Sequence, residues 1–260
     1  MNKLEEITAF KKIEIQKIKA DIKTEDLVKS PNFNRTPISL ANALTEKHSS
    51  GIIAEFKRKS PSKGLINGTA DVKVVTEDYL KAGVAAQSIL TDTAFFGGQA
   101  MDLVQARSVN SNVPILRKDF VIDAFQIVES KAIGADAILL IAAILTEQEL
   151  LNYIRLAEDL GLDVLFEVHN QQELDKLPAN AKIVGINNRD LTTFKVDLEH
   201  SINLASQLPK GTIKVSESGI SDPKIVTGLK QYGFQGFLIG ENFMKSEDPG
   251  LSCKAFIDGI

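Results

Sequence analysis

Short apolar segments alternate with amphipathic segments along the chain from about residue 51 onward. A segment that is apolar on both faces is typical of a strand buried in a parallel sheet. We therefore predict strands over residues 51–57, 85–92, 113–120, 137–143, 163–169, 182–188, 213–219 and 236–240.

The segments between these strands carry the signals of helix ends. Thr146 and Glu149 stand at the spacing of a capping box. Ser221 is the predicted N-cap of another helix, which has a proline in its first turn. Glycine recurs where a predicted helix ends and the next strand begins, a place that favours the left-handed conformation. These glycines are Gly83, Gly134, Gly161 and Gly233.

The strand–helix unit occurs eight times, with 19 to 34 residues between successive strand starts. An eight-stranded parallel sheet can close on itself and so remove both exposed edges. The predicted fold class is therefore α/β, a (β/α)8 TIM barrel. An open, doubly wound sheet is the rival fold.

Residues 1–50 precede the repeat, and we expect them to form an N-terminal helical extension packed on a single barrel domain, residues 1–260. One amphipathic helix is predicted near the start and a second over residues 38–47. Two interpretations of the extension stand side by side: a functional segment, and helical padding with no function. The apolar residues of the first helix are Leu4, Ile7, Phe10 and Ile18.

Composition and charge exclude several classes of protein. With 43% hydrophobic residues the chain is not a disordered tail. Cys253 is its only cysteine, which excludes an intrachain disulfide and suits a reducing compartment. The 30 basic and 34 acidic residues give a net charge of −4, which offers no electrostatic reason to expect a nucleic-acid partner.

The sequence shows no targeting or metal-binding pattern. Residues 1–19 mix charged and apolar side chains and lack the apolar core of a signal peptide. The longest apolar run, residues 137–145, is far shorter than the roughly 20 residues of a membrane helix, so we expect no membrane partner and a cytoplasmic location. No G-x-G-x-x-G fingerprint occurs, and the three histidines show no ligand spacing with Cys253, so we expect no cofactor and no metal.

Charged and amide side chains stand at the C-terminal ends of the predicted strands, where TIM barrels carry their reacting groups. Glu55 and Lys57 lie two residues apart, so they share a face of the first strand. Burying an unpaired charge costs several kcal/mol, so several such residues in equivalent places indicate a site. Neighbouring ammonium and carboxylate groups favour general acid–base chemistry. The residues on the other strands are Lys118, Glu167, Asn187 and Glu217.

Glycine turns follow the last two predicted strands, as Ser218-Gly219 and as Gly240-Glu241. Backbone N–H groups in these two places form the recurrent phosphate site of TIM barrels. Residues 60–64, after the first strand, add hydroxyl groups but by themselves indicate only a polar turn. His169, two residues beyond Glu167, is left out of the site, as a loop residue or as one that supports the site residues from outside.

With these residues in view, the chain closely resembles the indole-3-glycerol phosphate synthase family. The similarity extends over roughly residues 50–245, in family order, with Asn170 and Asn242 as small departures. The matching stretches are IIAEFKRKSPSKG, LTDTAFFGG, LRKDFVID, LFEVH, GINNRDLTTFKVDL, VSESGI and LIGENFM.

The resemblance implies a ring closure that needs no cofactor. The substrate would be 1-(2-carboxyphenylamino)-1-deoxyribulose 5-phosphate, and the products indole-3-glycerol phosphate, CO2 and water. The family is usually monomeric, which implies a monomer here. Two rivals are another phosphate-binding barrel enzyme, such as phosphoribosylanthranilate isomerase, and a phosphometabolite-binding protein without catalysis. The isomerase would not need the EFK and RKD stretches together, and a binding protein would not need two lysines buried beside carboxylates.

The resemblance also implies a role for each site residue. Lys118 is the general acid of ring closure, and Lys57 is the partner of the substrate carboxylate. Glu55 and Glu167 transfer protons, while Asn187 and Glu217 position substrate hydroxyls and the lysines; Arg189 has no assigned role. The implied phosphate-binding residues are Ser60, Ser218, Gly219, Gly240 and Glu241, and the implied walls of the ring pocket are Phe96, Phe120 and Leu139.

Overall fold

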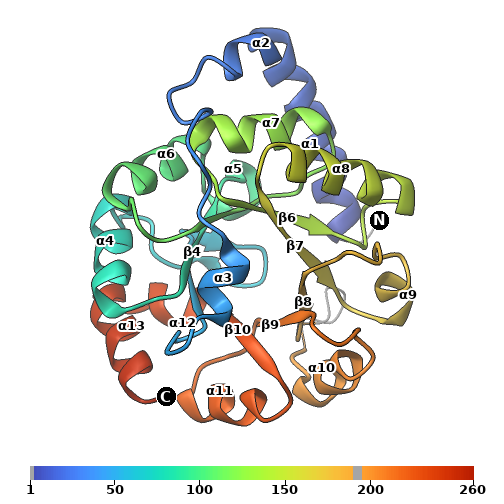
Figure 1. Ribbon diagram of the computed structural model, residues 1–260. Helices are drawn as coiled ribbons and strands as arrows, with labels where there is room; N and C mark the ends of the chain where they lie inside the picture. Colours follow the sequence, from blue (N-terminus) through green and yellow to red (C-terminus); the bar gives the residue numbers. More distant parts are fainter. Residues whose placement is uncertain (1–2, 190–194) are drawn as a thin grey trace.

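The computed structural model describes residues 3–189 and 195–260; residues 190–194, part of the family-like stretch GINNRDLTTFKVDL, lie outside the described residues. Eight parallel strands close into a barrel in the order β1-β10-β9-β8-β7-β6-β5-β4, with helices around it (Figure 1). The last strand pairs with the first, so the TIM-barrel prediction is confirmed and the open sheet is excluded.

Each predicted strand is present, with somewhat different ends. The eighth begins at Phe234, two residues before its predicted start, and most others are shorter than predicted. The barrel strands are β1 (Ile52–Phe56), β4 (Ala86–Leu90), β5 (Ile115–Lys118), β6 (Ala137–Ile141), β7 (Asp163–Val168), β8 (Ile183–Asn187), β9 (Ile213–Glu217) and β10 (Phe234–Ile239).

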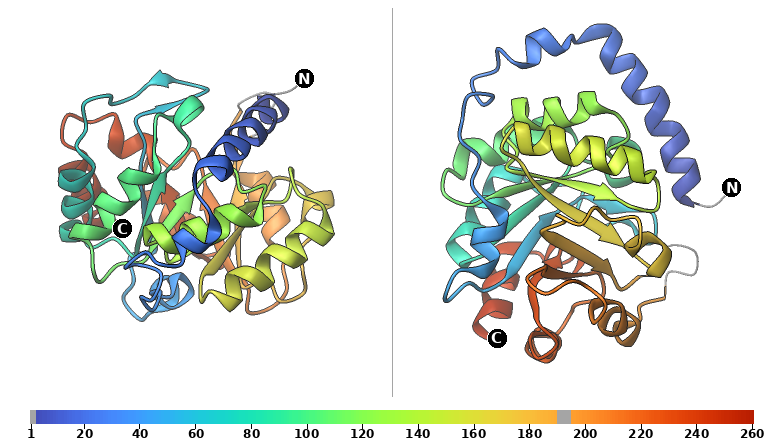
Figure 2. Two further views of the ribbon diagram at one scale, coloured as in Figure 1. Left: turned by 90° about the horizontal axis from the view of Figure 1, so that it is seen from above. Right: turned by 45° about the vertical axis from the view of Figure 1, so that its right-hand side comes forward.

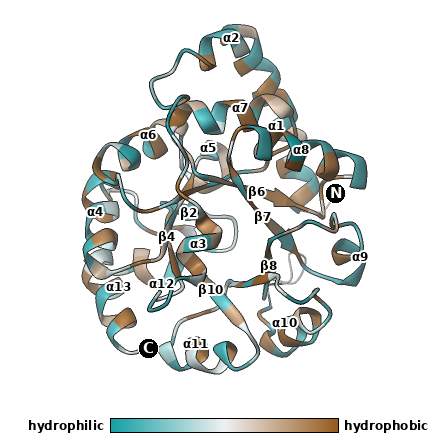
Figure 3. Cartoon of the chain, viewed as in Figure 1, coloured by the Kyte–Doolittle hydropathy of each residue, from teal (hydrophilic) through white to brown (hydrophobic). Residues whose placement is uncertain are grey.

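Helices follow the barrel strands and place their apolar faces on the barrel and their polar faces outside (Figure 3). The polar turn predicted after β1 is a small antiparallel hairpin of β2 (Lys59–Ser60) and β3 (Gly64–Leu65). The helices that follow the strands are α4 (Val72–Ala82), α5 (Thr93–Phe96), α6 (Ala100–Val109), α7 (Ala124–Ile133), α8 (Glu147–Asp159), α9 (Gln171–Leu174), α10 (Leu198–Ala205), α11 (Pro223–Lys230), and, after the last strand, α12 (Glu241–Met244) and α13 (Pro249–Asp258).

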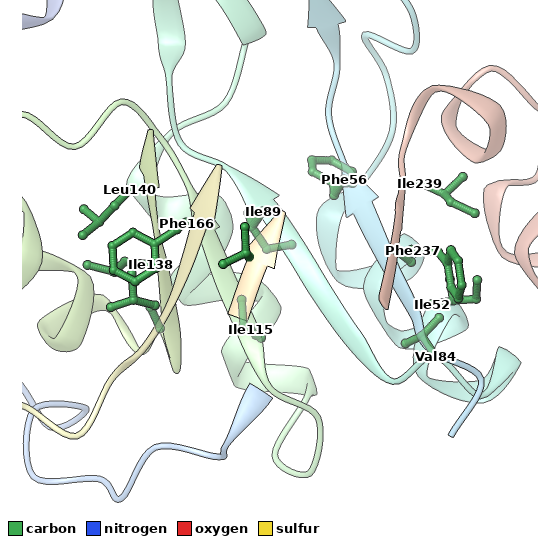
Figure 4. Packing of buried hydrophobic residues seen from close by; sticks show 14 of the residues in the cluster. Ile52, Phe56, Val84, Ile89, Ile115, Ile138, Leu140, Phe166, Phe237 and Ile239 are labelled. Atoms are coloured by element: carbon green, nitrogen blue, oxygen red, sulfur yellow. The ribbon is translucent and has the colours of Figure 1, made fainter. Parts of the chain in front are cut away.

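Two hydrophobic clusters stabilise the barrel. Side chains alternate along a strand, so one set packs under the helices and the other fills the barrel interior. Ile52 and Phe56 belong to the outer cluster, part of which Figure 4 shows, and Ile53 belongs to the inner one. Glu55 is two residues beyond Ile53, so this alternation directs its carboxylate inward.

The helix ends follow the predicted signals with one exception. The Thr146–Glu149 capping box is present, and Gly83, Gly134, Gly161 and Gly233 all have positive φ angles. The N-cap predicted at Ser221 is wrong. Asp222 caps α11 instead and accepts a hydrogen bond from the Lys224 N–H, as a carboxylate at a helix N-terminus is favoured by the helix dipole.

The N-terminal segment reaches both ends of the barrel (Figure 2). Leu40 and Leu44 of α3 (Leu40–Thr45) join the inner cluster, as does Ile7 of α1 (Lys3–Asp21) at the opposite end. A short helix, α2 (Thr24–Leu27), was not predicted. None of the helices in the described part of the chain has the length and hydropathy needed to cross a membrane.

The predicted apolar face of α1 is partly wrong. Ile7 is buried, but Phe10 is 46% exposed and Ile18 is only partly covered. The helix instead buries Lys11 and Ile15. Helix α1 lies across the polar mouth of the barrel, where the buried ion pairs of Lys11 with Asp92 and Asp119 turn the Lys11 face inward.

Candidate active site

A cavity of about 380 Å³ opens at the C-terminal ends of the barrel strands. Its size is in the range of small-molecule sites, and TIM barrels carry their active sites at this end. All of the site residues predicted from the sequence line it: Glu55, Lys57, Ser60, Phe96, Lys118, Phe120, Leu139, Glu167, Asn187, Glu217, Ser218, Gly219, Gly240 and Glu241.

Lys118 lies at the centre of the charged part of the cavity. Its Nζ atom is 3.5 Å from Glu167 Oε2 and 3.5 Å from Glu217 Oε2, and all three side chains are largely buried. The Nδ2 atom of Asn187 donates to Glu167 Oε1 at 3.3 Å. The end of β5 thus places one ammonium group between carboxylates from β7 and β9.

Burial and mutual charge perturb these three groups strongly. Burial alone would lower the pKa of Lys118, but Glu217, Glu167 and Glu55 hold that pKa above its usual range. Burial alone would raise the pKa of Glu167, but Lys118 and His169 outweigh it and hold the pKa well below its usual range. Burial raises the pKa of Glu217 to about 8. Lys118 lowers this pKa but only partly offsets burial, and repulsion from Glu167 and Glu55 raises it further.

Lys57 forms a second ion pair in the same mouth. Its Nζ atom lies 2.8 Å from Glu55 Oε1, at the end of β1, and its side chain is 16% exposed. An added Cβ at Gly240 would lie 2.6 Å from Glu55 Oε1, so the glycine after β10 makes room for this carboxylate. The two lysines therefore belong to separate charged groups on different strands.

The turn after β9 has an unusual backbone. Ser218 and Gly219 have φ angles of 70° and 74°, and a non-glycine residue in this region is uncommon. Asn188 holds the turn, because its Nδ2 atom donates to the Ser218 carbonyl at 2.7 Å. Successive residues of this kind can form a concave nest of N–H groups that suits an anion.

Aromatic side chains line another part of the cavity. The rings of Phe96 and Phe120 are 6.0 Å apart at an interplanar angle of 39°, and Leu139 of β6 is buried beside them in the cavity wall. Leu4 and Ile7 of α1 line the same cavity. The N-terminal helix is therefore part of the cavity wall.

Comparison with known proteins identifies the family of the chain. The family model described as indole-3-glycerol phosphate synthase matches residues 4–256. The chain belongs to the indole-3-glycerol phosphate synthase family. It is thus an enzyme, a carboxy-lyase of tryptophan biosynthesis, and it acts on a phosphorylated small molecule.

Individual relatives agree with the family match. The indole-3-glycerol phosphate synthase of Bacteroides thetaiotaomicron is 47% identical over 257 residues, covering 99% of this chain and 98% of that protein. The enzyme of the same name from Caldanaerobacter subterraneus subsp. tengcongensis is 46% identical, with 99% and 98% coverage. These matches do not favour the isomerase or the non-catalytic rival.

Solved structures of lower identity share the fold. Tryptophan synthase subunit alpha from Legionella pneumophila superposes with a TM-score of 0.59 at 13% identity, covering 85% of this chain and 97% of that one. Thiamine phosphate pyrophosphorylase from Pyrococcus furiosus gives 0.58 at 14% identity, with 85% and 98% coverage. At these identities the likeness shows the barrel alone.

A buried cluster of ion pairs holds α1 over the cavity. Lys11 Nζ lies 2.9 Å from Asp92 Oδ2 and 3.0 Å from Asp119 Oδ1. Asp119 directly follows Lys118, and Asp92 caps the short helix that carries Phe96. Lys11 therefore ties the extension to two segments of the site wall.

Sequence reasoning missed three parts of the site. His169 was left out of the site, as a loop residue or as one that supports the site residues from outside; its Nε2 atom lies 3.3 Å from Glu167 Oε1, which agrees with the second alternative. Asn188 was passed over although it holds the Ser218 turn, and the α1 residues were given no place in the cavity. The spacing of two residues between Glu167 and His169 was the available signal, because residues so spaced share a strand face.

Proposed function

We propose that the chain converts 1-(2-carboxyphenylamino)-1-deoxyribulose 5-phosphate to indole-3-glycerol phosphate, CO2 and water. The observation that carries the proposal is Lys118 between two buried carboxylates, in a cavity with aromatic side chains and a positive-φ turn. One C–C bond forms, the bond to the carboxylate breaks, and a hydroxyl leaves as water. These changes balance without an oxidant or reductant.

In the proposed mechanism Lys118 is the general acid of ring closure. Ring carbon C1 attacks the ketone carbon C2′, and the ammonium group donates a proton to the developing alkoxide. Burial alone would favour the neutral amine, but the carboxylates of Glu217 and Glu167 hold this lysine in its protonated form before the reaction. The electron pair of the bond to CO2 then restores the aromatic ring.

Lys57 binds the substrate carboxylate and also serves as an acid for dehydration. Its ion pair with Glu55 holds the Lys57 side chain in the mouth of the barrel. Glu55 and Glu167 are the carboxylates of proton transfer. In the dehydration, Lys57 gives a proton to the hydroxyl that leaves C2′ as water, and Glu167 accepts the proton that C1′ loses as the indole double bond forms. Asn187 and Glu217 position the lysines and the substrate hydroxyls.

The phosphate of the substrate binds across the turns after β9 and β10. Ser218 and Gly219 offer N–H groups in the positive-φ turn, and Gly240 and Glu241 offer those at the start of α12. Glu241 contributes through its backbone, because its carboxylate lies 3.7 Å from both Arg189 and Lys63. The Ser60 hydroxyl completes the site from the hairpin after β1.

The anthranilate ring occupies the aromatic part of the cavity, between Phe96, Phe120 and Leu139. Leu4 and Ile7 cover it from the side of α1.

We further propose that the 260 residues act as one domain, as a monomer in the cytoplasm, without nucleic-acid or membrane partners. Light scattering and cell fractionation test these assignments.

The test of the reaction is spectroscopic. The purified chain, treated with EDTA, is mixed with the anilino substrate, and the absorbance and fluorescence of the indole product are followed together with CO2 release. We expect stoichiometric indole-3-glycerol phosphate and CO2 at full rate. Folded protein that forms no indole, or that needs added Mg²⁺ or Zn²⁺, contradicts the proposal.

A further inference from the structure

The two carboxylates beside Lys118 have different surroundings, although each lies 3.5 Å from the ammonium nitrogen. Both oxygens of Glu167 face donors, with Lys118 on Oε2 and with Asn187 and His169 on Oε1. Within residues 3–189 and 195–260, Glu217 Oε1 is buried and has no hydrogen-bond partner. The asymmetry therefore comes from the groups on the far side of Glu167.

His169 is the charged group on that far side. It follows β7 directly, and its ring lies between two carboxylates, with Nε2 3.3 Å from Glu167 Oε1 and Nδ1 3.0 Å from Glu173 Oε2. Nε2 is buried and makes no hydrogen bond in the described part of the chain, so the Glu167 carboxylate meets it as an ion-pair partner. A neutral imidazole carries one N–H group, so only the doubly protonated ring presents a proton to both carboxylates.

The ring is also held in place by its own surroundings. Glu173 Oε2 accepts a second hydrogen bond, from the His169 backbone N–H at 2.8 Å, and Glu173 Oε1 accepts one from Asn170 at 2.8 Å. His200 of α10 bonds to the His169 carbonyl at 2.8 Å. These contacts fix both the backbone and the far carboxylate, so the imidazole has one orientation toward Glu167.

We propose that His169 is a positioning residue which, as an imidazolium shared by Glu167 and Glu173, keeps Glu167 ionised and aimed at Lys118 and so separates its role from that of Glu217. The inference rests on the proposed function, in which Glu167 accepts a proton. Two titratable groups whose environments differ in this way are suited to opposite acid–base roles. Glu167 is then the base, and the unpartnered Glu217 is the carboxyl group that is protonated first.

The electrostatics of the cluster agree with the geometry. Burial alone would lower the pKa of His169, but Glu167 and Glu173 raise it to about 10. The other charged groups that face this pair are Lys118 from β5, Glu217 from β9 and Glu55 from β1. His169 is thus charged throughout the neutral range, and it acts as a constant charge and not as a switch.

The test removes the charge and keeps a donor, in the variant His169→Gln. An opposite charge at this distance lowers a carboxyl pKa by about 1–3 units, so its loss should raise the Glu167 pKa by that amount. The acidic limb of the kcat–pH profile should move upward by about 1–3 pH units, with kcat recovering at higher pH. His200→Gln is the matched control, since it touches the same segment but no site carboxylate, and its profile should not move.

Glu173→Gln provides a second variant in case His169→Gln does not fold. It leaves the ring in place and removes its far carboxylate, so the same limb should move in the same direction by less. A loss of kcat in His169→Gln that is equal at every pH, or no change at all, overturns the proposal.

A measurement without substrate keeps this test separate from that of the proposed function. In ¹⁵N-labelled protein at pH 8, the histidine signal that disappears in His169→Gln should have both ring nitrogens protonated. A singly protonated ring overturns the inference even if the enzyme is active. If the wild-type chain forms no indole, the proposed function fails while the charge of the ring is still decided.

Discussion

Adding one methyl group at Gly185 should disable the site from inside the barrel. Gly185 lies in the middle of β8, and a Cβ built there would be 3.2 Å from Glu217 Cδ and far inside contact distance of Glu217 Oε1. Leu165 Cδ1, also at 3.2 Å, blocks another direction. Because Gly185 has a φ angle that other residues adopt, the effect of Gly185→Ala is steric and not conformational.

The size of the effect follows from the displacement. The Glu217 carboxylate has to move by about 1 Å to restore ordinary van der Waals contact. A misplacement of about 1 Å can cost about 10²-fold in rate, which corresponds to about 2.7 kcal/mol of barrier. Overpacking a barrel interior costs a further 1–3 kcal/mol, roughly, in the free energy of unfolding.

The assay compares Gly185→Ala with Gly228→Ala by steady-state kinetics and urea unfolding. Gly228 lies in α11, and an added Cβ there meets nothing within 4 Å. Gly228→Ala should keep its activity and gain about 0.5–1 kcal/mol, because alanine favours a helix over glycine. Wild-type kcat/KM in folded Gly185→Ala would refute the placement of Glu217 in the chemistry.

Three further changes test other parts of the structure. Gly240→Asp should raise KM sharply and lower kcat, because the carboxylate opposes the phosphate and the added Cβ displaces Glu55; unchanged constants would remove this turn from the site. Lys11→Met should lower the free energy of unfolding by about 3–5 kcal/mol in urea, since it takes the ammonium partner away from the buried carboxylates of Asp92 and Asp119, whereas the exposed Lys12→Met should change little. The stability of the wild type relative to His169→Gln should fall as pH rises from about 6.5 toward 10, because the folded chain keeps a proton that the unfolded chain releases; a difference that is constant with pH would show no such linkage.

The barrel could be predicted from sequence because its strands are buried on both faces and its helices end at glycines with positive φ. The same reasoning failed for α1. Helical periodicity indicated Phe10 as a core residue, yet Phe10 is exposed and Lys11 is buried. The partners of Lys11 are aspartates more than 80 residues away, and no local pattern reports such an ion pair.

For the site, the sequence indicated the residues that line the cavity but not the residues that support them. Charges at strand ends identified the residues of the cavity, because TIM barrels bring these ends together. His169 lies one residue past the end of β7, and its role depends on Glu173 in a separate short helix. Gly185 carries no side chain, so its contribution appears only when the position of Glu217 is known.

The most direct test of the account is the kcat of Lys118→Met. Lys118 is placed to donate a proton in the transition state, and positioned acid catalysis is worth about 10²–10⁴-fold. We expect kcat and kcat/KM to fall together by at least about 10²-fold with KM nearly unchanged, whereas Lys57→Met should also raise KM. Circular dichroism checks that both variants are folded. A folded Lys118→Met enzyme with near wild-type kcat would contradict the central claim and direct attention to Lys57 as the acid.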